Sequence, residues 1–81
     1  NLGLAFERKG QLDQAISEYQ EAVRRLPDSA AAHNSLGIAL AQQGRLDEAL
    51  TQFQDAVRLD PTYQAAQANL KMARQLKQQA R

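Results

Sequence analysis

Residues 44–61 read GRLDEALTQFQDAVRLDP, and residues 10–27 read GQLDQAISEYQEAVRRLP. Nine of the 18 aligned positions are identical, and the offset between the two copies is constant (44 − 10 = 34 and 61 − 27 = 34). We call this offset the repeat period. The pair Leu2-Gly3 returns one repeat period later as Leu36-Gly37. A fixed period of this size indicates stacked helical units, because a single unit of that length cannot bury its apolar face alone.

The composition limits the classes of protein to which the chain can belong. Its 81 residues suit one small domain, and a formal net charge of +1 gives no general attraction to nucleic acid or acidic membranes. Without cysteine, the chain has neither a disulfide framework nor a thiolate metal site. No apolar run has the length of a membrane span, and no signal peptide is visible. We therefore expect a soluble protein, with the cytoplasm slightly favoured and the compartment otherwise unknown.

Apolar residues recur at spacings of three and four along each unit, which is the period of one helix face. Glycines and prolines mark the predicted helix ends, and Asp28 or Ser29 is suited to cap the helix that follows Pro27. Gly10 and Gly44 each read as the glycine that closes a helix. The sequence thus predicts about five helices joined by short turns, with neighbours antiparallel, at about residues 1–9, 13–26, 30–43, 47–60 and 64–80.

The two ends of the chain depart from the repeat. Leu70 falls where Leu36 falls, so the last segment begins like another repeat. Lys71 and Arg74 then stand in the places of Gly37 and Leu40, positions at which a helix packs against a partner helix. This indicates a solvated helix that caps the stack. At the other end, Asn1 stands inside an amphipathic pattern with no cap before it, which indicates a cut end.

These residues resemble the tetratricopeptide repeat (TPR), a 34-residue unit with Trp-x2-Leu-Gly-x2-Tyr, then Ala-x3-Phe and a closing Pro. The second unit matches at Leu36-Gly37, Leu40, Ala49, Phe53, Ala56 and Pro61, and the first at Leu2-Gly3, Phe6, Ala15, Tyr19, Ala22 and Pro27. His33 takes the place of the Trp. A related family of slightly longer helical repeats reads RNA bases, but the period of 34 and the closing Pro favour the TPR.

The resemblance implies an all-α fold, a right-handed α-solenoid of antiparallel helix-turn-helix units. Residues 1–81 then form a single TPR domain, with an N-terminally truncated repeat (1–29), a full repeat (30–63) and a capping helix (64–81). The truncated repeat leaves an apolar edge uncovered. Either the chain belongs to a longer solenoid, or it hides this edge by self-association, which includes an exchange of helices between copies.

In TPR proteins the first helix of each repeat lines a concave groove that accepts an extended peptide or a helix. The resemblance therefore implies a protein-interaction module or scaffold whose partner is a protein or peptide. By the family's geometry, the groove residues of this chain are Leu4, Arg8, Asn34, Ile38, Gln42, Asn69 and Met72. Leu4, Ile38 and Met72 recur at the repeat period. This column indicates an apolar groove floor that suits a hydrophobic peptide or an amphipathic helix, or else residues that only pack the stack.

Two alternatives to a peptide groove remain. One is a structural role in which the repeats mainly mediate homo-oligomerisation. The other is binding of an anionic polymer by the basic last helix, where cations follow at spacings of three and four: Lys71, Arg74, Lys77 and Arg81. No aromatic residue lies among them to stack bases, and cations also suit the C-terminal end of a helix. We therefore expect neither nucleic acid nor a membrane as partner.

A third use of TPR grooves, binding of acidic chaperone tails through a clamp of Lys, Asn and Arg, does not suit these residues. The corresponding positions hold Leu4, Ser35, Ala65 and Asn69. Leucine, serine and alanine cannot fix a carboxylate through charged hydrogen bonds.

The residues give little support for an enzyme. His33 is the only histidine, and in the Trp position it is expected to pack between helices. Asp13 and Asp47 are separated by one repeat period because each stands in the first turn of a repeat helix. Neither a glycine-rich phosphate loop nor a nucleophile elbow occurs. We expect no catalytic residues, no cofactor and no metal.

Overall fold

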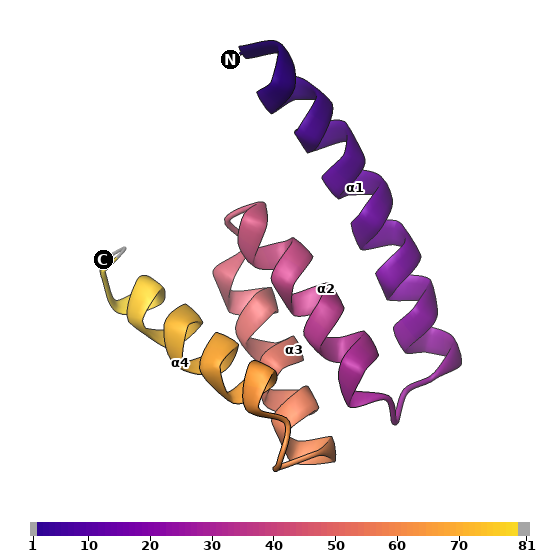
Figure 1. Cartoon of the computed structure of the whole chain (residues 1–81), viewed down its shortest axis with the longest axis vertical. Helices are drawn as coiled ribbons and strands as arrows, with labels where there is room; N and C mark the ends of the chain where they lie inside the picture. Colours follow the sequence, from indigo (N-terminus) through magenta and orange to yellow (C-terminus); the bar gives the residue numbers. More distant parts are fainter. Residues whose placement is uncertain (1, 80–81) are drawn as a thin grey trace.

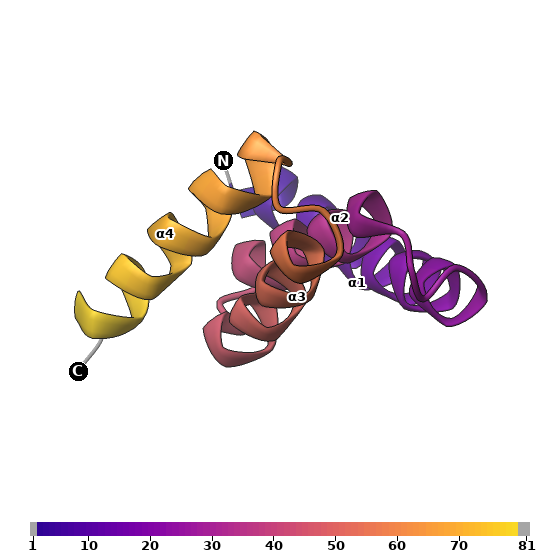
Figure 2. The ribbon, with the colours of Figure 1, turned by 90° about the horizontal axis from the view of Figure 1, so that it is seen from below.

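The computed structural model describes the backbone of residues 2–79 and the side chains of residues 10–79. It contains four helices, which are α1 (Leu2–Arg25), α2 (Ala30–Gln42), α3 (Leu46–Leu59) and α4 (Gln64–Gln79). Each helix packs against the next in the chain, and α2 also contacts α4 (Figures 1 and 2). The predicted all-α fold of stacked helices is confirmed, since the described residues form helices and turns without a strand.

The turn between α2 and α3 is built around Gly44. This residue has a φ of +81°, in the left-handed region that glycine adopts without a steric penalty. The Arg45 N–H donates to the Leu40 carbonyl at 2.9 Å, and the Gly44 N–H donates to the Ala41 carbonyl at 3.0 Å. These two bonds form a Schellman motif, which satisfies the last carbonyls of α2. Gly44 closes its helix as the sequence predicts.

Gly10 forms no such turn. Residues 2–25 are one continuous helix, so the predictions of separate helices at 1–9 and 13–26, and of about five helices in total, are wrong. As a continuation of α1, residues 2–9 need no helix nucleus of their own, and a glycine inside a helix costs only about 1 kcal/mol relative to alanine. At 1.5 Å per residue α1 is about 36 Å long. Its N-terminal end extends beyond the other three helices (Figure 1).

The core lies where α2 and α3 approach each other. Phe53 is 1% exposed, and a Cβ added to Gly37 would lie 2.5 Å from its Cε1 atom. Only glycine therefore allows α2 to lie this close to the aromatic ring. The buried apolar cluster around this contact comprises Ile16, Leu36, Ala39, Leu40, Ala49, Leu50, Phe53 and Ala73.

Candidate partner-binding site

The start of α2 is fixed to its surroundings by Ser29 and His33. The Ser29 Oγ caps the helix by accepting a hydrogen bond from the Ala32 N–H at 3.2 Å. His33 is buried; its Nε2–H donates to the Pro27 carbonyl at 2.9 Å, and its Nδ1 lies 2.7 Å from Gln52 Oε1. Both ring nitrogens are thus engaged within the fold, and His33 packs between helices as the sequence predicts.

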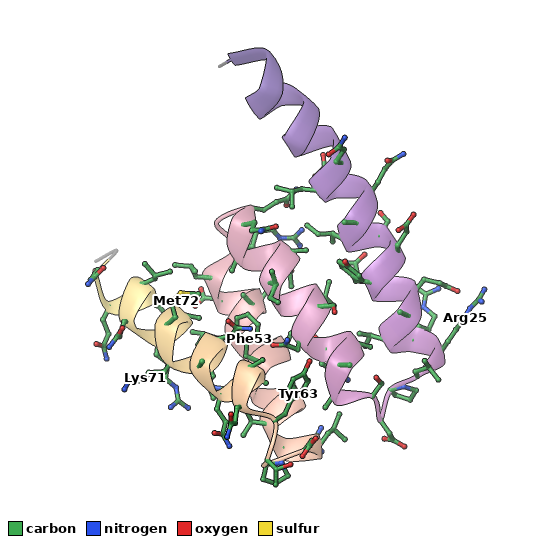
Figure 3. The ribbon with its side chains drawn as sticks, in the orientation of Figure 1. Arg25, Phe53, Tyr63, Lys71 and Met72 are labelled. Carbon is green, nitrogen blue, oxygen red and sulfur yellow. The ribbon has the colours of Figure 1, made fainter. Side chains whose placement is uncertain are left out.

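Two of the predicted groove residues, Asn34 and Asn69, are brought together by the fold. Asn34 on α2 is 5% exposed, and its Oδ1 accepts a hydrogen bond from Asn69 Nδ2 on α4 at 3.0 Å. Its own Nδ2 donates to the Tyr63 hydroxyl at 3.4 Å, just before α4 begins (Figure 3). These hydrogen bonds link α2 to α4 and to the residue before it.

Exposed apolar side chains follow the same repeat position on α2 and α4. Ile38 on α2 is 39% exposed. Met72, which lies one repeat period later on α4 and is labelled in Figure 3, is 49% exposed. Gln42 is exposed one turn beyond Ile38, and its equivalent on α4 is Leu76, which is 42% exposed. We call Ile38, Met72 and Leu76 the apolar row. Leu76 was not predicted as a groove residue, although its place one repeat period after Gln42 could have revealed it.

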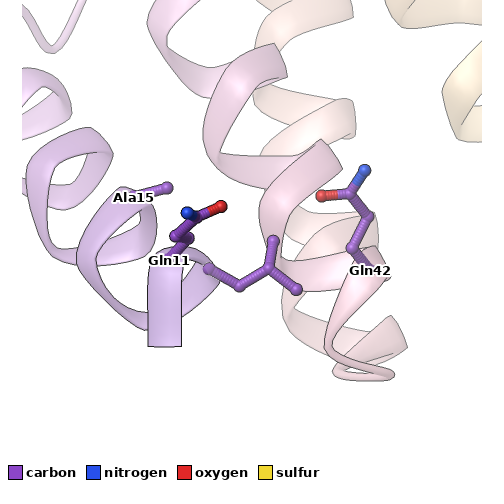
Figure 4. Close-up of a pocket in the computed structure, with 4 residues that line it drawn as sticks. Gln11, Ala15 and Gln42 are labelled. Carbon is purple, nitrogen blue, oxygen red and sulfur yellow. The ribbon is translucent and has the colours of Figure 1, made fainter. Parts of the chain in front are cut away.

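Two hollows that share Leu12, Ala15 and Gln42 lie between α1 and α2. The first, drawn in Figure 4, is also lined by Gln11. The second is also lined by Tyr19, Ser35, Ile38 and Ala39, and we call the two together the α1–α2 hollow. Tyr19, one of the lining residues, is 36% exposed. Sequence reasoning did not predict this hollow, because it placed residues 1–9 in an antiparallel helix of their own. Ile38 and Gln42, two of the predicted groove residues, also line this hollow.

The remaining predicted groove residues, Leu4 and Arg8, belong to α1, but their side chains lie outside the described part of the chain. The geometry that the sequence predicts for this end of the groove assumed the turn at Gly10. Without that turn, residues 2–9 continue along the axis of α1 and do not fold back onto α2 (Figure 1). The predicted groove residues whose side chains are described therefore lie on α2 and α4.

The basic last helix is partly neutralised by α3. Lys77 Nζ lies 2.5 Å from Asp47 Oδ1, at the start of α3. Lys71 and Arg74 are exposed on α4, and Arg81 lies outside the described residues. At least one of the four cations of the predicted stripe, Lys77, is therefore paired within the chain.

Acidic and basic side chains at the α2–α3 turn also pair locally. Arg45 donates from Nε to Glu48 Oε1 at 2.9 Å and from Nη2 to Glu48 Oε2 at 2.5 Å. These hydrogen bonds raise the pKa of the Arg45 guanidinium, with smaller contributions from the charges of Glu48 and Asp13. Among the described residues, no group of three or more His, Cys, Asp or Glu could hold a metal ion. None of the described helices combines the length and apolar character needed to cross a membrane.

Comparison with known proteins places the chain in a family. The family model described as tetratricopeptide repeat matches residues 1–64, which are 64 of the 81 residues. No curated protein matches the chain. Tetratricopeptide repeats generally mediate protein–protein interactions and are typically non-enzymatic scaffolds. With its repeat period of 34, its stacked helices and this match, the chain belongs to the tetratricopeptide repeat family.

Proposed function

We propose that this chain is an interaction module that binds a peptide or helix of a partner protein in a concave, partly apolar groove. The single observation that carries the proposal is the apolar row, with Ile38 and Met72 39% and 49% exposed at equivalent positions. Burying such side chains against a partner gains about 25 cal/mol for each Å² of apolar surface removed from water. We assign no enzymatic activity to the chain.

The polar neighbours of the row support recognition of a partner with mixed character. Asn34 and Asn69 are hydrogen-bonded to each other and link α2 to α4. This link supports a groove that is formed before a partner binds. A preformed groove lowers the entropy cost of association. The exposed amide of Gln42 offers both a donor and an acceptor beside Ile38. An amphipathic helix whose apolar anchors recur at helical spacing suits such a surface.

The proposed groove follows the division of the chain into residues 1–29, 30–63 and 64–81. The first helix of each unit would supply one apolar residue to this groove. These residues are Leu4, Ile38 and Met72, which recur at the repeat period. Leu4 and Arg8 contribute to the groove only in a conformation in which residues 2–9 pack beside α2. In the conformation described, the remaining proposed groove residues lie on α2 and α4.

The proposal can be tested by selecting helical peptides from a displayed library against the whole chain. We expect the selected peptides to lose about tenfold or more in affinity, which is about 1.4 kcal/mol, with Ile38→Glu or Met72→Glu. Gln54→Glu, which adds the same charge at an exposed position of α3, is the matched control and should leave binding unchanged. Selected peptides that bind all three variants equally would show that the groove is not the binding site.

The salt dependence of binding separates this groove from an anionic-polymer site. Binding through phosphate contacts weakens steeply as salt rises, because counterions are released. Burial of the apolar row predicts nearly constant affinity over the same range. A steep loss of affinity with salt, together with loss on Lys71→Ala and Arg74→Ala, would favour the basic helix over the groove.

A further inference from the structure

The second repeat shows how the first helix of a repeat is seated. α2 contacts both α3 and α4. On the α3 side, Gly37 lies against the ring of Phe53. On the α4 side, Asn34 accepts its hydrogen bond from Asn69. The first helix of the repeat thus fills the angle between its own second helix and the next helix along the chain.

The α1–α2 hollow is the equivalent seat in the first repeat, and none of the described residues places a first helix in it. Ala15 and Tyr19 on its α1 wall match Ala49 and Phe53, and Ser35 on its α2 wall matches Asn69, each one repeat period later. Tyr19 is 36% exposed, whereas Phe53 is 1% exposed. The hollow is therefore open on the side where α2 covers α3 in the second repeat.

The segment with the right sequence for this seat is residues 2–9. It matches residues 36–43, with Leu2-Gly3 in the place of Leu36-Gly37 and Phe6 in the place of Leu40. In the continuous α1 this segment cannot reach the hollow of its own chain, because Gly3 and Tyr19 are about 24 Å apart along the helix axis. The α1–α2 hollow and residues 2–9 therefore belong to the same chain, but the straight α1 keeps them apart.

Gly10 is the point at which the two conformations differ. In the straight helix it has no positive φ, and a Cβ added to it would meet nothing within 4 Å. Nothing in this conformation requires glycine at position 10. The equivalent Gly44 adopts a φ of +81° to form the turn between α2 and α3. Gly10 thus permits a closed hairpin as well as the straight helix seen here.

We propose that two copies of this chain form a dimer by exchanging residues 2–9, so that the segment of each copy fills the α1–α2 hollow of the other. The straight α1 helices then lie antiparallel. Gly37 contacts Phe53, and Arg45 is midway between them in the sequence. The equivalent pair one repeat period earlier is Gly3 and Tyr19, and Gln11 is midway between these two. The two-fold axis passes near Gln11, and Gly3 of one copy packs against Tyr19 of the second copy.

A second copy is the occupant that the observations favour. It carries the segment whose match, residues 36–43, fills the equivalent seat in this structure. Exchange also keeps α1 straight, as it is here, and makes the interface the same on both copies. The inference does not depend on the peptide groove, because the interface needs no partner protein.

The first test is the solution mass of the whole chain by light scattering, from micromolar to millimolar concentration. We expect a dimer that dissociates on dilution. Gly10→Ala favours the straight helix and disfavours the closed hairpin, so the variant should dimerise at least as tightly as the parent chain. A chain that is monomeric across the whole series, or a Gly10→Ala variant that dimerises less, would overturn the proposal.

A proline substitution tests the straight helix directly. Leu12→Pro removes a helical hydrogen bond and adds a clash if α1 is straight, but it is tolerated at the first position of a helix that follows a turn. We expect this variant to be mainly monomeric where the parent is dimeric. Leu46→Pro places proline at the first residue of α3 and is the matched control, which should keep the dimer. A dimer unaffected by Leu12→Pro would show that another surface mediates association.

The register is tested by a disulfide between copies, since the chain has no cysteine of its own. Gly3→Cys and Tyr19→Cys chains are mixed and oxidised. We expect a cross-linked heterodimer, because a disulfide needs Cα atoms within about 7 Å. Gln14→Cys, exposed on α1, replaces Tyr19→Cys as the control and should not cross-link to Gly3→Cys. Equal cross-linking of both pairs, or of neither, would exclude the proposed antiparallel exchange.

Discussion

Residues 12–25 of α1 and residues 46–59 of α3 carry the same pattern, but they differ in burial. Ala49, Phe53 and Ala56 on α3 are 0%, 1% and 0% exposed. Their equivalents on α1 are Ala15 and Ala22, which are half-buried, and Tyr19, which is 36% exposed. The difference arises because α2 covers one face of α3, whereas the matching face of α1 lines the α1–α2 hollow. A repeat sequence therefore specifies a helix, and the neighbouring helix determines how deeply it is buried.

The largest expected difference between the two units is at the aromatic position. Phe53→Ala should destabilise the fold by about 3–5 kcal/mol, since it empties a fully buried site. Tyr19→Ala should cost only about 1–2 kcal/mol, because part of its surface already contacts water. Urea denaturation followed by circular dichroism, at a concentration where the chain is monomeric, measures both. Equal losses would break the comparison, since they would mean that residues 2–9 fold back over Tyr19.

Enlarging Gly37 tests the close approach of α2 and α3. Gly37→Leu forces a side chain into the ring of Phe53 and should destabilise the chain by about 3 kcal/mol. Thermal unfolding provides the measurement. Ala31→Leu adds a leucine at an exposed position of the same helix and should change stability by less than about 0.5 kcal/mol. An unchanged melting temperature for Gly37→Leu would refute the role of this glycine.

The two closing glycines should respond in opposite directions to alanine. Gly44→Ala places a Cβ in the left-handed region and should cost about 1–2 kcal/mol. Gly10→Ala in the straight α1 should instead stabilise the helix by about 1 kcal/mol, since nothing lies near the added methyl group. Urea midpoints of the two variants give both values. If Gly10→Ala destabilised the chain as much as Gly44→Ala, then Gly10 would form a turn in solution.

Most of the fold could be predicted from the sequence because its signals are local. Ser29 caps α2 and Gly44 ends the turn after it, and both residues act through their own backbone neighbourhood. The turn at Gly10 was predicted from the same signal and was wrong. A glycine permits a left-handed conformation without enforcing it, so the outcome depends on whether residues 2–9 gain more by packing than by continuing the helix.

The candidate site was predictable to a smaller extent. The repeat period places Ile38 and Met72 at equivalent exposed positions, because a repeated position has a repeated environment. The bond between Asn34 and Asn69 could not be read from that period, since the two residues are 35 apart. The α1–α2 hollow was missed for the same reason as the continuous helix. It exists only because residues 2–9 lie elsewhere.

The smallest expected effect concerns a polar contact that occurs in both units. Asp13 on α1 accepts a hydrogen bond from Gln43 Nε2, and Asp47 on α3 pairs with Lys77, each partner one repeat period after its counterpart. The Asp47 and Lys77 side chains are 78% and 51% exposed, so Lys77→Ala should cost less than about 0.5 kcal/mol. Urea denaturation at low and high salt measures this loss, which should shrink as salt screens the pair.

Lys77→Gln gives the second unit the uncharged contact of the first and serves as the control. It should remove the part of the salt dependence that the Asp47–Lys77 pair contributes while preserving a hydrogen bond to Asp47, so its stability should match that of the parent chain at high salt. A loss for Lys77→Ala that is above about 1 kcal/mol and independent of salt would contradict this expectation. It would mean that the lysine contributes through packing of its methylene chain between α3 and α4, and that the polar contacts of the two units differ in kind as well as in charge.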